Sequence, residues 1–203
     1  MPPSFTDAAS VCQVPRADPA QTLAKLRHDG WNALEAPLPE ADRIALAIAA
    51  MARDIQTAER LNEKTRDPIW KEFWARAVKV ADASVDAGDN ENRMVALRHH
   101  ALDSYMLFAT AQIPNRTMVT CSFTIPGNSD KGKLLIRYMV GKVTPGGFTV
   151  VVKRESSLFS RARADEVYVL PDPKALAARL GVASNISMVF STYLTFAERD
   201  LVP

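Results

Sequence analysis

The chain has 203 residues, of which 47% are hydrophobic and 24% are charged, and its formal net charge is +2. These values are typical of a soluble globular protein with one sizeable core, and they exclude a largely disordered chain. Lysine and arginine are scattered along the sequence, so we expect no nucleic-acid partner, because neutralising several phosphates needs clustered positive charge. No apolar run approaches the roughly 20 residues that cross a bilayer, so no membrane span is expected.

Two cysteines, Cys12 and Cys121, bear on the compartment. A disulfide between them would close a loop of roughly 110 residues, stabilise the fold by about 4–5 kcal/mol and indicate a periplasmic or secreted protein. The alternative is two buried thiols in a cytoplasmic protein, which agrees with an N-terminal sequence that lacks the basic end and apolar core of a secretory signal. No cysteine–histidine pattern indicates zinc.

The N-terminal half predicts helices after an extended segment over residues 1–17. Asp18 and Pro19 form a helix start, because aspartate caps exposed amides and proline lacks an amide hydrogen, and Gly30 ends that helix. A second helix is predicted over 40–66, where apolar residues recur at helical spacing: Ile44, Ile48, Met51, Ile55 and Ala58.

Two further helices are predicted before the sheet. Asp67-Pro68 repeats the start signal, and the third helix runs over 69–87 to a break at Gly88-Asp89-Asn90. The fourth runs over 91–112 and ends at Pro114. Residues 18–113 are therefore predicted to be mainly helical.

The C-terminal half predicts strands. Val119, Cys121, Phe123 and Ile125 alternate with polar residues, and turn residues follow, so 116–153 predicts an antiparallel meander of three consecutive strands. A polar loop with Arg161 and Arg163 comes next. It is followed by a short strand over 166–170, a helix opened by Asp172-Pro173 and ended by Gly181, and a last strand over 186–197.

These elements predict one α+β domain over residues 1–203. A layer of about four helices packs on a mainly antiparallel sheet of four to five strands, formed by 116–197, with one short helix before the last strand.

Residues 127–134, GNSDKGKL, match the phosphate-loop spacing GxxxxGK as far as the lysine. The next residue of that motif is serine or threonine, which holds magnesium, and here it is Leu134. The motif must also open a helix, whereas the residues that follow predict a strand. We interpret the segment as a polar hairpin turn and expect no nucleotide or other cofactor.

His99, His100 and Asp103 are the candidate catalytic residues. On the helix predicted for 91–112, His99 and Asp103 lie one turn apart on the polar side. A carboxylate in that position can orient an imidazole for general-base catalysis. A solvated polar face is the alternative, and since two ligands do not make a zinc site, no metal is expected.

Trp70, Phe73 and Trp74 are the candidate binding residues. Tryptophan at helical spacing packs in a core more often than in a site. The apolar arc of this helix is wide, however, so neighbouring elements need not cover all of it, and an uncovered aromatic patch marks a binding surface.

The sequence supports two hypotheses for function. The first is a non-catalytic binding or accessory protein that recognises a protein partner or a small apolar ligand through a groove between helices and sheet. The alternative is a small hydrolase that uses His99 or His100 with Asp103. The first is preferred because each catalytic motif sought is missing or broken, including the GxSxG nucleophile motif. The sequence gives no oligomeric state.

Overall fold

The computed structural model describes residues 19–59, 63–85, 94–114, 116–126, 150–158, 161–170 and 172–197. Its helices are α2 (Pro19–His28), α3 (Glu40–Glu59), α4 (Glu63–Ala83) and α6 (Pro173–Leu180), together with the short 3₁₀ helix η1 (His100–Leu102). Its strands are β1 (Asn32–Ala33), β2 (Met94–His99), β3 (Ser104–Ile113), β4 (Arg116–Pro126), β5 (Val150–Leu158), β6 (Arg161–Val169) and β7 (Ile186–Ala197).

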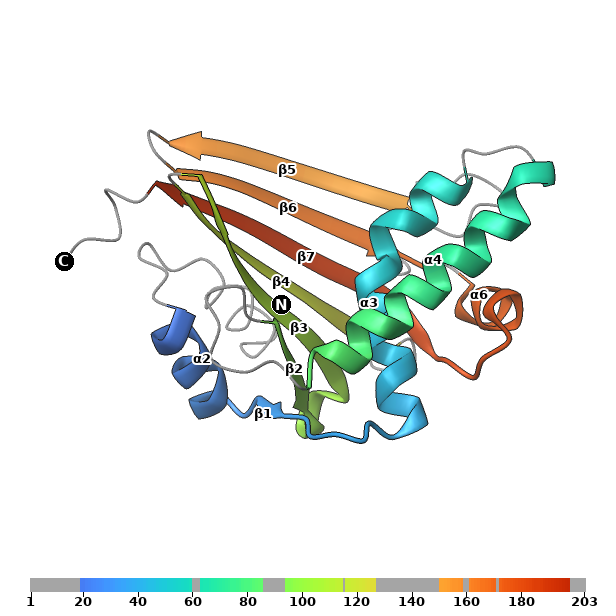
Figure 1. The fold of residues 1–203 in the computed structure, drawn as a ribbon, viewed down its shortest axis with the longest axis horizontal. Coiled ribbons are helices and arrows are strands. Elements are labelled where there is room, and N and C mark those ends of the chain that lie inside the picture. Colours follow the sequence, from blue (N-terminus) through green and yellow to red (C-terminus); the bar gives the residue numbers. More distant parts are fainter. Residues whose placement is uncertain are drawn as a thin grey trace.

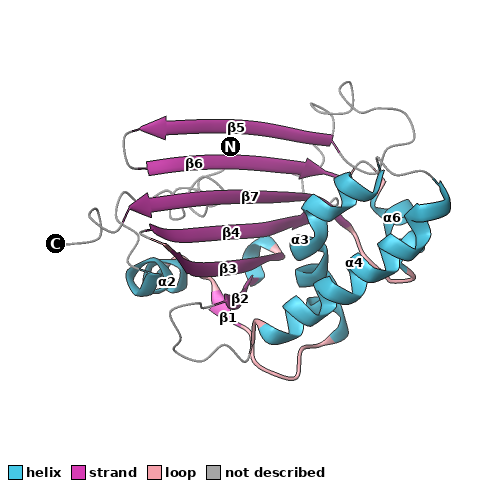
Figure 2. Cartoon of the chain, turned by 45° about the horizontal axis from the view of Figure 1, so that its top comes forward, coloured by secondary structure: helices cyan, strands magenta, loops and turns pink. Residues whose placement is uncertain are grey.

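The described strands form one antiparallel sheet in the order β1-β2-β3-β4-β7-β6-β5 (Figure 1). The α+β class and the mainly antiparallel sheet are therefore confirmed, and four described strands, β4 to β7, come from the C-terminal half as predicted. Within the described residues the sheet has seven strands in all, because β1, β2 and β3 from the N-terminal half extend it. α3 and α4 lie across one end of the sheet, with α6 beside α4 (Figures 1 and 2).

The helix predicted over 91–112 is wrong, because β2, η1 and β3 occupy most of this segment. Tyr105 and Leu107 belong to the core beneath α3, whereas Met106 and Phe108 are buried on the opposite face of β3. A strand that is buried on both faces carries a nearly continuous apolar run, which lacks the two-residue alternation of a half-exposed strand. That run resembles the apolar arc of a helix.

The predicted meander is also wrong for its first strand. β4 pairs with β3 on one edge and with β7 on the other, so neither edge pairs with the next strand in the sequence. β7 comes from the end of the chain and enters the sheet between β4 and β6. Residues 127–149, which include the GNSDKGKL segment, lie outside the described residues.

Two helix and loop boundaries differ from the prediction. α4 begins at Glu63, so Pro68 lies inside the helix and not at its start, although its ring removes one backbone hydrogen bond. The segment 156–165, predicted as a polar loop, contains the end of β5 and the start of β6, including the backbone of Arg161 and Arg163.

Other boundaries confirm the predicted caps. The Asp172 carboxylate accepts a hydrogen bond from the Ala175 amide at 2.9 Å, and Gly181 closes α6 in the left-handed conformation. Gly30 follows α2 with a φ of +93°. The last strand has the predicted bounds.

The sheet separates two buried regions. On one face, α3 and α4 pack on Tyr105, Leu107, Tyr168 and Val189. On the other, Trp31, which follows α2, makes an edge-to-face contact with Phe123 on β4, with ring centroids 6.4 Å apart. Side chains alternate along a strand, so Phe123 and its neighbour Thr124 point to opposite faces. We call the face that carries Thr124 and contacts α3 the helix-side face.

Candidate functional site

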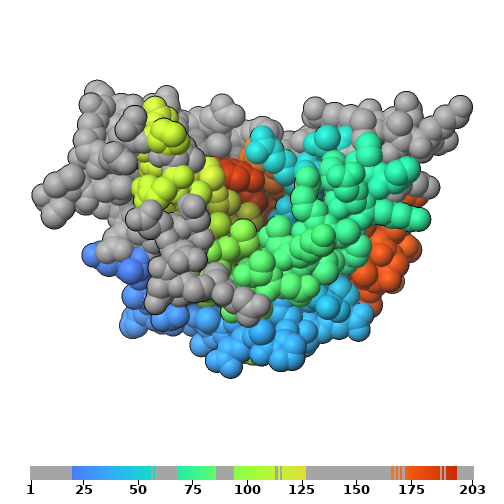
Figure 3. Space-filling model, in the orientation of Figure 1, coloured from blue at the N-terminus to red at the C-terminus, as the bar shows by residue number. Residues whose placement is uncertain are grey.

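The helix-side face of the sheet becomes more exposed with distance from α3. Along β4, Thr124 is fully buried, Ser122 is 8% exposed, and Thr120 and Met118 are half-buried. β3 repeats this gradient, since Leu107 is buried while Ala109 and Ala111 are half-buried. The helices therefore cover only part of this face. In the space-filling view, β7 is seen in a recess between β4 and α3 (Figure 3).

We call this recess the groove. Apolar and small side chains form its outer part, namely Ala109, Ala111, Met118, Thr120 and Thr195. These residues pair across β3, β4 and β7, which places them on one continuous surface.

A polar cluster lies at the inner end of the groove and consists of Ser122, Glu166, Tyr168, Ser191 and Tyr193. The strand register aligns Ser122 with Ser191 and Ser191 with Glu166, so one row crosses β4, β7 and β6. The Ser122 and Ser191 hydroxyl oxygens are hydrogen-bonded at 2.8 Å. The Tyr168 hydroxyl donates a hydrogen bond to Glu166.

Glu166 sets the electrostatics of the cluster. Glu166 is 5% exposed as a whole residue, and aspartate and glutamate are rarely buried to this extent without partners. Burial and then the hydrogen bond to Glu166 raise the pKa of Tyr168. Burial and then the charge of Glu166 raise the pKa of Tyr193. Both phenols therefore stay protonated well above neutral pH and act as neutral hydrogen-bonding groups.

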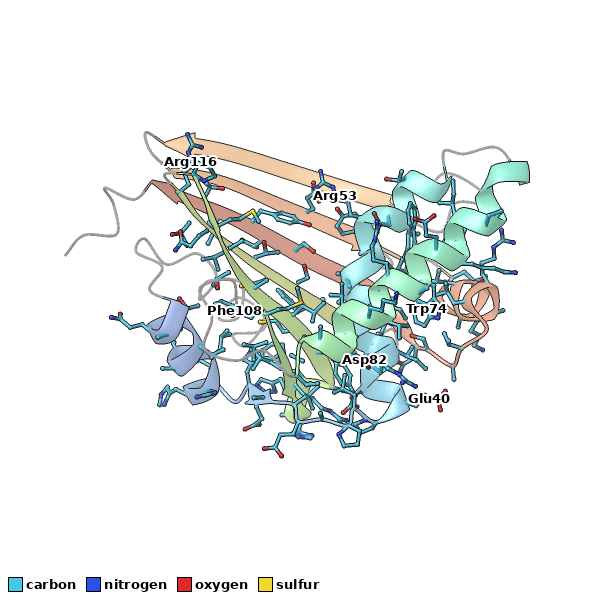
Figure 4. The ribbon with its side chains drawn as sticks, in the orientation of Figure 1. Glu40, Arg53, Trp74, Asp82, Phe108 and Arg116 are labelled. Atoms are coloured by element: carbon cyan, nitrogen blue, oxygen red, sulfur yellow. The ribbon has the colours of Figure 1, made fainter. Side chains whose placement is uncertain are left out.

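Arg53 supplies positive charge near the cluster. It is exposed on α3 and extends from that helix over the sheet (Figure 4). Its charge acts in the opposite direction to that of Glu166 and offsets a small part of the rise in the pKa of Tyr168 and of Tyr193. The carboxylate is thus at the buried end of the groove and the guanidinium is at the solvent side.

A second polar network joins α3 to the β2–β3 hairpin. The buried Asp42 carboxylate accepts a hydrogen bond from the Tyr105 hydroxyl at 2.8 Å and from Arg98 Nη1 at 3.3 Å. Arg98 also lies over the Tyr105 ring, at 5.1 Å from its centroid. Asp42 is in the first turn of α3, where a carboxylate is favoured by the helix dipole. This network fixes the start of α3 on the sheet. Its three residues, Asp42, Arg98 and Tyr105, are not among those that form the groove.

The structure does not place His99 and Asp103 as a dyad. His99 ends β2, and its Nε2 is 3.1 Å from the Asp29 carbonyl oxygen, while its ring makes an edge contact with Trp31. Asp103 lies in the tight turn after η1 with a φ of +47°, where its carboxylate is 3.8 Å from Arg98 Nη2. His100 is exposed in η1. The one-turn spacing of the predicted helix does not exist here, because the segment is a strand and a turn.

The position of His99 also explains why residue 30 is a glycine. A Cβ atom at residue 30 would lie 3.0 Å from His99 Nε2, and the φ of +93° disfavours any side chain there. His99 therefore packs closely against the end of α2 and has a structural contact.

The three aromatic residues of α4 differ in burial. Trp70 is 3% exposed and belongs to the core beneath the helices. Phe73 and Trp74 are partly buried against that core, and the Arg76 guanidinium lies 5.0 Å from the Phe73 ring centroid. The groove is formed by strand residues, so the predicted binding residues lie on a different surface from the polar cluster.

Cys121 is buried on the face of β4 opposite the groove. It is not a free thiol in this structure. Cys12 lies outside the described residues, so the pairing of the two cysteines stays a prediction.

Sequence reasoning missed the polar cluster, although one signal was present. Ser191, Tyr193 and Thr195 alternate with apolar residues in β7, which predicts a polar face for that strand. The other members come from β4 and β6, and only the strand order brings them to β7.

In the described part of the chain, no group of three or more histidine, cysteine, aspartate or glutamate side chains is arranged to hold a metal ion. No helix within the described ranges combines the length and apolar character needed to cross a membrane. No protein-family model, curated protein or solved structure matches the chain.

Proposed function

We propose that this protein is a non-catalytic binding protein that takes a small ligand with an apolar body into the groove. The observation that carries the proposal is the polar cluster at the inner end of a partly uncovered sheet face. A sheet face beneath helices is normally apolar, because buried polar groups need hydrogen-bond partners, and here five polar side chains replace that packing.

The shape of the surface favours a small ligand. Binding sites for small molecules are concave, largely apolar and provided with a few polar groups that fix orientation. The outer part of the groove offers Ala109, Ala111 and Met118 for an apolar body, and the cluster offers polar groups for one end of the ligand.

Within the described residues, no contact of His99 supports the hydrolase hypothesis. A general base needs its orienting group within hydrogen-bond reach, and the contacts of His99 go to Asp29 and Trp31. The phenols of the cluster stay protonated, which suits hydrogen bonding to a ligand.

The test is the binding of Nile red, a neutral apolar dye whose emission rises and shifts to the blue in apolar surroundings. We expect saturable binding to the wild-type protein and its loss in Ala109→Trp, because the indole fills the outer part of the groove. The matched control is Ala178→Trp, at an exposed position on α6, which should bind the dye like the wild type. Equal binding by Ala109→Trp and the wild type, with both variants folded, would place the site elsewhere.

A further inference from the structure

The charged residues around the groove indicate which chemical class of ligand it accepts. We infer that the ligand is an alkyl carboxylate: its anionic head group pairs with Arg53, and its apolar chain lies along Ala111 and Met118 in the outer part of the groove. This inference rests on the proposed function, because it assigns a ligand class to the same groove.

The buried carboxylate at the inner end of the groove is already compensated. Glu166 accepts a hydrogen bond from the Tyr168 hydroxyl, and it has a further interaction in the structure. The register of β5 and β6 places Lys153 directly opposite Glu166, and directly paired positions lie on the same face of a sheet. A positive charge at that position balances the carboxylate, so the inner end adds no net charge that would repel an anion.

Arg53 carries a positive charge that lacks a partner among the described residues. Its guanidinium is exposed and forms no hydrogen bond or ion pair with any residue that the structure describes. The neighbouring Asp54 carboxylate pairs with Arg76 of α4. The charge of Arg53 acts on both Tyr168 and Tyr193, so the guanidinium lies near the polar cluster, and it extends over the sheet (Figure 4).

Hydroxyl groups on the helix-side face supply further donors for an anion. Tyr193 on β7 is directly paired with Thr120 on β4, and both residues are half-buried. The Tyr193 phenol stays protonated at neutral pH, so it can donate a hydrogen bond. A carboxylate has about four acceptor positions, and a guanidinium binds two of them with parallel N–H groups. The remaining positions are open to a hydroxyl donor.

The register of the strands gives the direction of the apolar chain. Ala111, Met118 and Thr195 are paired across β3, β4 and β7, one row further from α3 than Thr120 and Tyr193. All three are half-buried, so an alkyl chain that extends from Arg53 onto this row would remove apolar surface from water.

Arg116 is a second exposed arginine, at the outer end of β4 and on the same face of the sheet (Figure 4). Its directly paired residues, Ile113 and Ala197, have no hydrogen-bond donor in their side chains. We therefore assign the head group to Arg53, where hydroxyl donors are near. The reverse orientation, with the carboxylate at Arg116, is an outcome that the test distinguishes.

The experiment compares three ligands that share one alkyl chain and differ in the head group: octanoate, 1-octanol and octylammonium. Binding to the full-length protein is measured by isothermal titration calorimetry at neutral pH and low salt. We expect octanoate to bind at least about fivefold more tightly than either of the others. The preference should shrink when salt is added, because salt screens an exposed charge. Octanoate binding no tighter than that of either other ligand would overturn the inference.

Arg53→Gln removes the charge at an exposed position, so it should abolish the preference for octanoate in folded protein. Arg27→Gln, at an exposed position on α2, is the matched control and should retain the preference. Full preference in folded Arg53→Gln would contradict the assignment of the head group. Its loss in Arg116→Gln instead would place the carboxylate at the outer end of β4.

The two proposals fail in different ways. If all three ligands bind equally and Ala109→Trp blocks all of them, the groove binds apolar ligands and only the assigned ligand class is wrong. If none of the three binds and Nile red binding is insensitive to Ala109→Trp, the groove itself is not a binding site and both proposals fail.

Discussion

Three tyrosines in the two polar networks have raised pKa values, and each shift has a local cause. Burial followed by hydrogen bonding to a carboxylate raises the pKa of Tyr105, next to Asp42, and of Tyr168, next to Glu166. Burial and then the charge of Glu166 raise that of Tyr193. In all three cases ionisation of the phenol would place a second negative charge near a carboxylate in a poorly solvated position.

The raised pKa values of these tyrosines predict that the protein becomes less stable at alkaline pH. The unfolded chain releases phenol protons near pH 10, about the ordinary tyrosine value, while the native state retains them. The unfolded state therefore binds fewer protons above that pH, so the free energy of unfolding is unaffected below about pH 10 and falls as the pH rises further. Each shifted tyrosine contributes a slope of up to about 1.4 kcal/mol per pH unit.

The measurement is urea unfolding as a function of pH for the wild type and Tyr168→Phe. We expect the variant to have a shallower alkaline slope by about the contribution of one tyrosine. At neutral pH it should be less stable by about 1–3 kcal/mol, because Glu166 loses a buried hydrogen-bond donor. Parallel slopes for the two proteins would show that Tyr168 titrates normally.

At the scale of elements, α4 shows how one amphipathic helix can be assigned to either packing or binding. Its apolar residues follow a helical arc, as the sequence indicates, but the arc has an inner part at Trp70 and an outer part at Phe73 and Trp74. The helix position relative to α3 and the sheet decides this division. The hydrophobic pattern alone cannot, because it records the direction of a side chain and not what covers it.

This division predicts unequal costs of truncation. Trp70→Ala should lower the free energy of unfolding by about 3–5 kcal/mol, since it empties a volume in the core, whereas Trp74→Ala should cost clearly less. Urea unfolding of both variants measures the two losses of free energy. The two substitutions remove the same side chain from the same helix, so each serves as the comparison for the other.

Nile red binding to the same variants adds a functional readout. Binding by Trp74→Ala should equal that of the wild type if the groove is the site. A selective loss of dye binding in stable Trp74→Ala protein would instead move the site to the aromatic residues of α4.

At the scale of the molecule, the sheet has two different faces. The helix-side face leads from the core out into the groove, while the opposite face is buried along β4 at Thr117, Val119, Cys121 and Phe123. A cysteine on the buried face is protected from solvent, and a bond from it to Cys12 would attach the start of the chain to the centre of the sheet. That bond would act on the whole fold, because it joins distant parts of the sequence.

The expected outcome is that thiol titration of the denatured protein finds two protected cysteines without reductant and two reactive ones with it. Reduction should then lower the free energy of unfolding by up to about 4–5 kcal/mol. Cys12→Ser serves as the control, since its stability should not respond to reductant. Two reactive thiols in the untreated protein would support the cytoplasmic alternative.

The sequence by itself determined the elements whose signals are local. Asp172 with Gly181 marked α6, Gly30 marked the end of α2, and alternation marked β4 and β7, because caps, turns and half-exposed strands depend on neighbours within a few residues. Local signals failed for β2 and β3, where coverage from both sides removed the alternation.

Only the tertiary structure decided the order of the strands and, with it, the site. Ser122, Glu166 and Ser191 are separated along the chain, and they meet because β7 inserts between β4 and β6. No local rule records such a pairing, since it depends on which distant edges satisfy their backbone hydrogen bonds together. His99 shows the reverse case. Its residue type made it a catalytic candidate in the sequence, but in the fold its ring packs against Asp29 and Gly30 at the end of α2. The spacing of residues in the sequence does not indicate that contact.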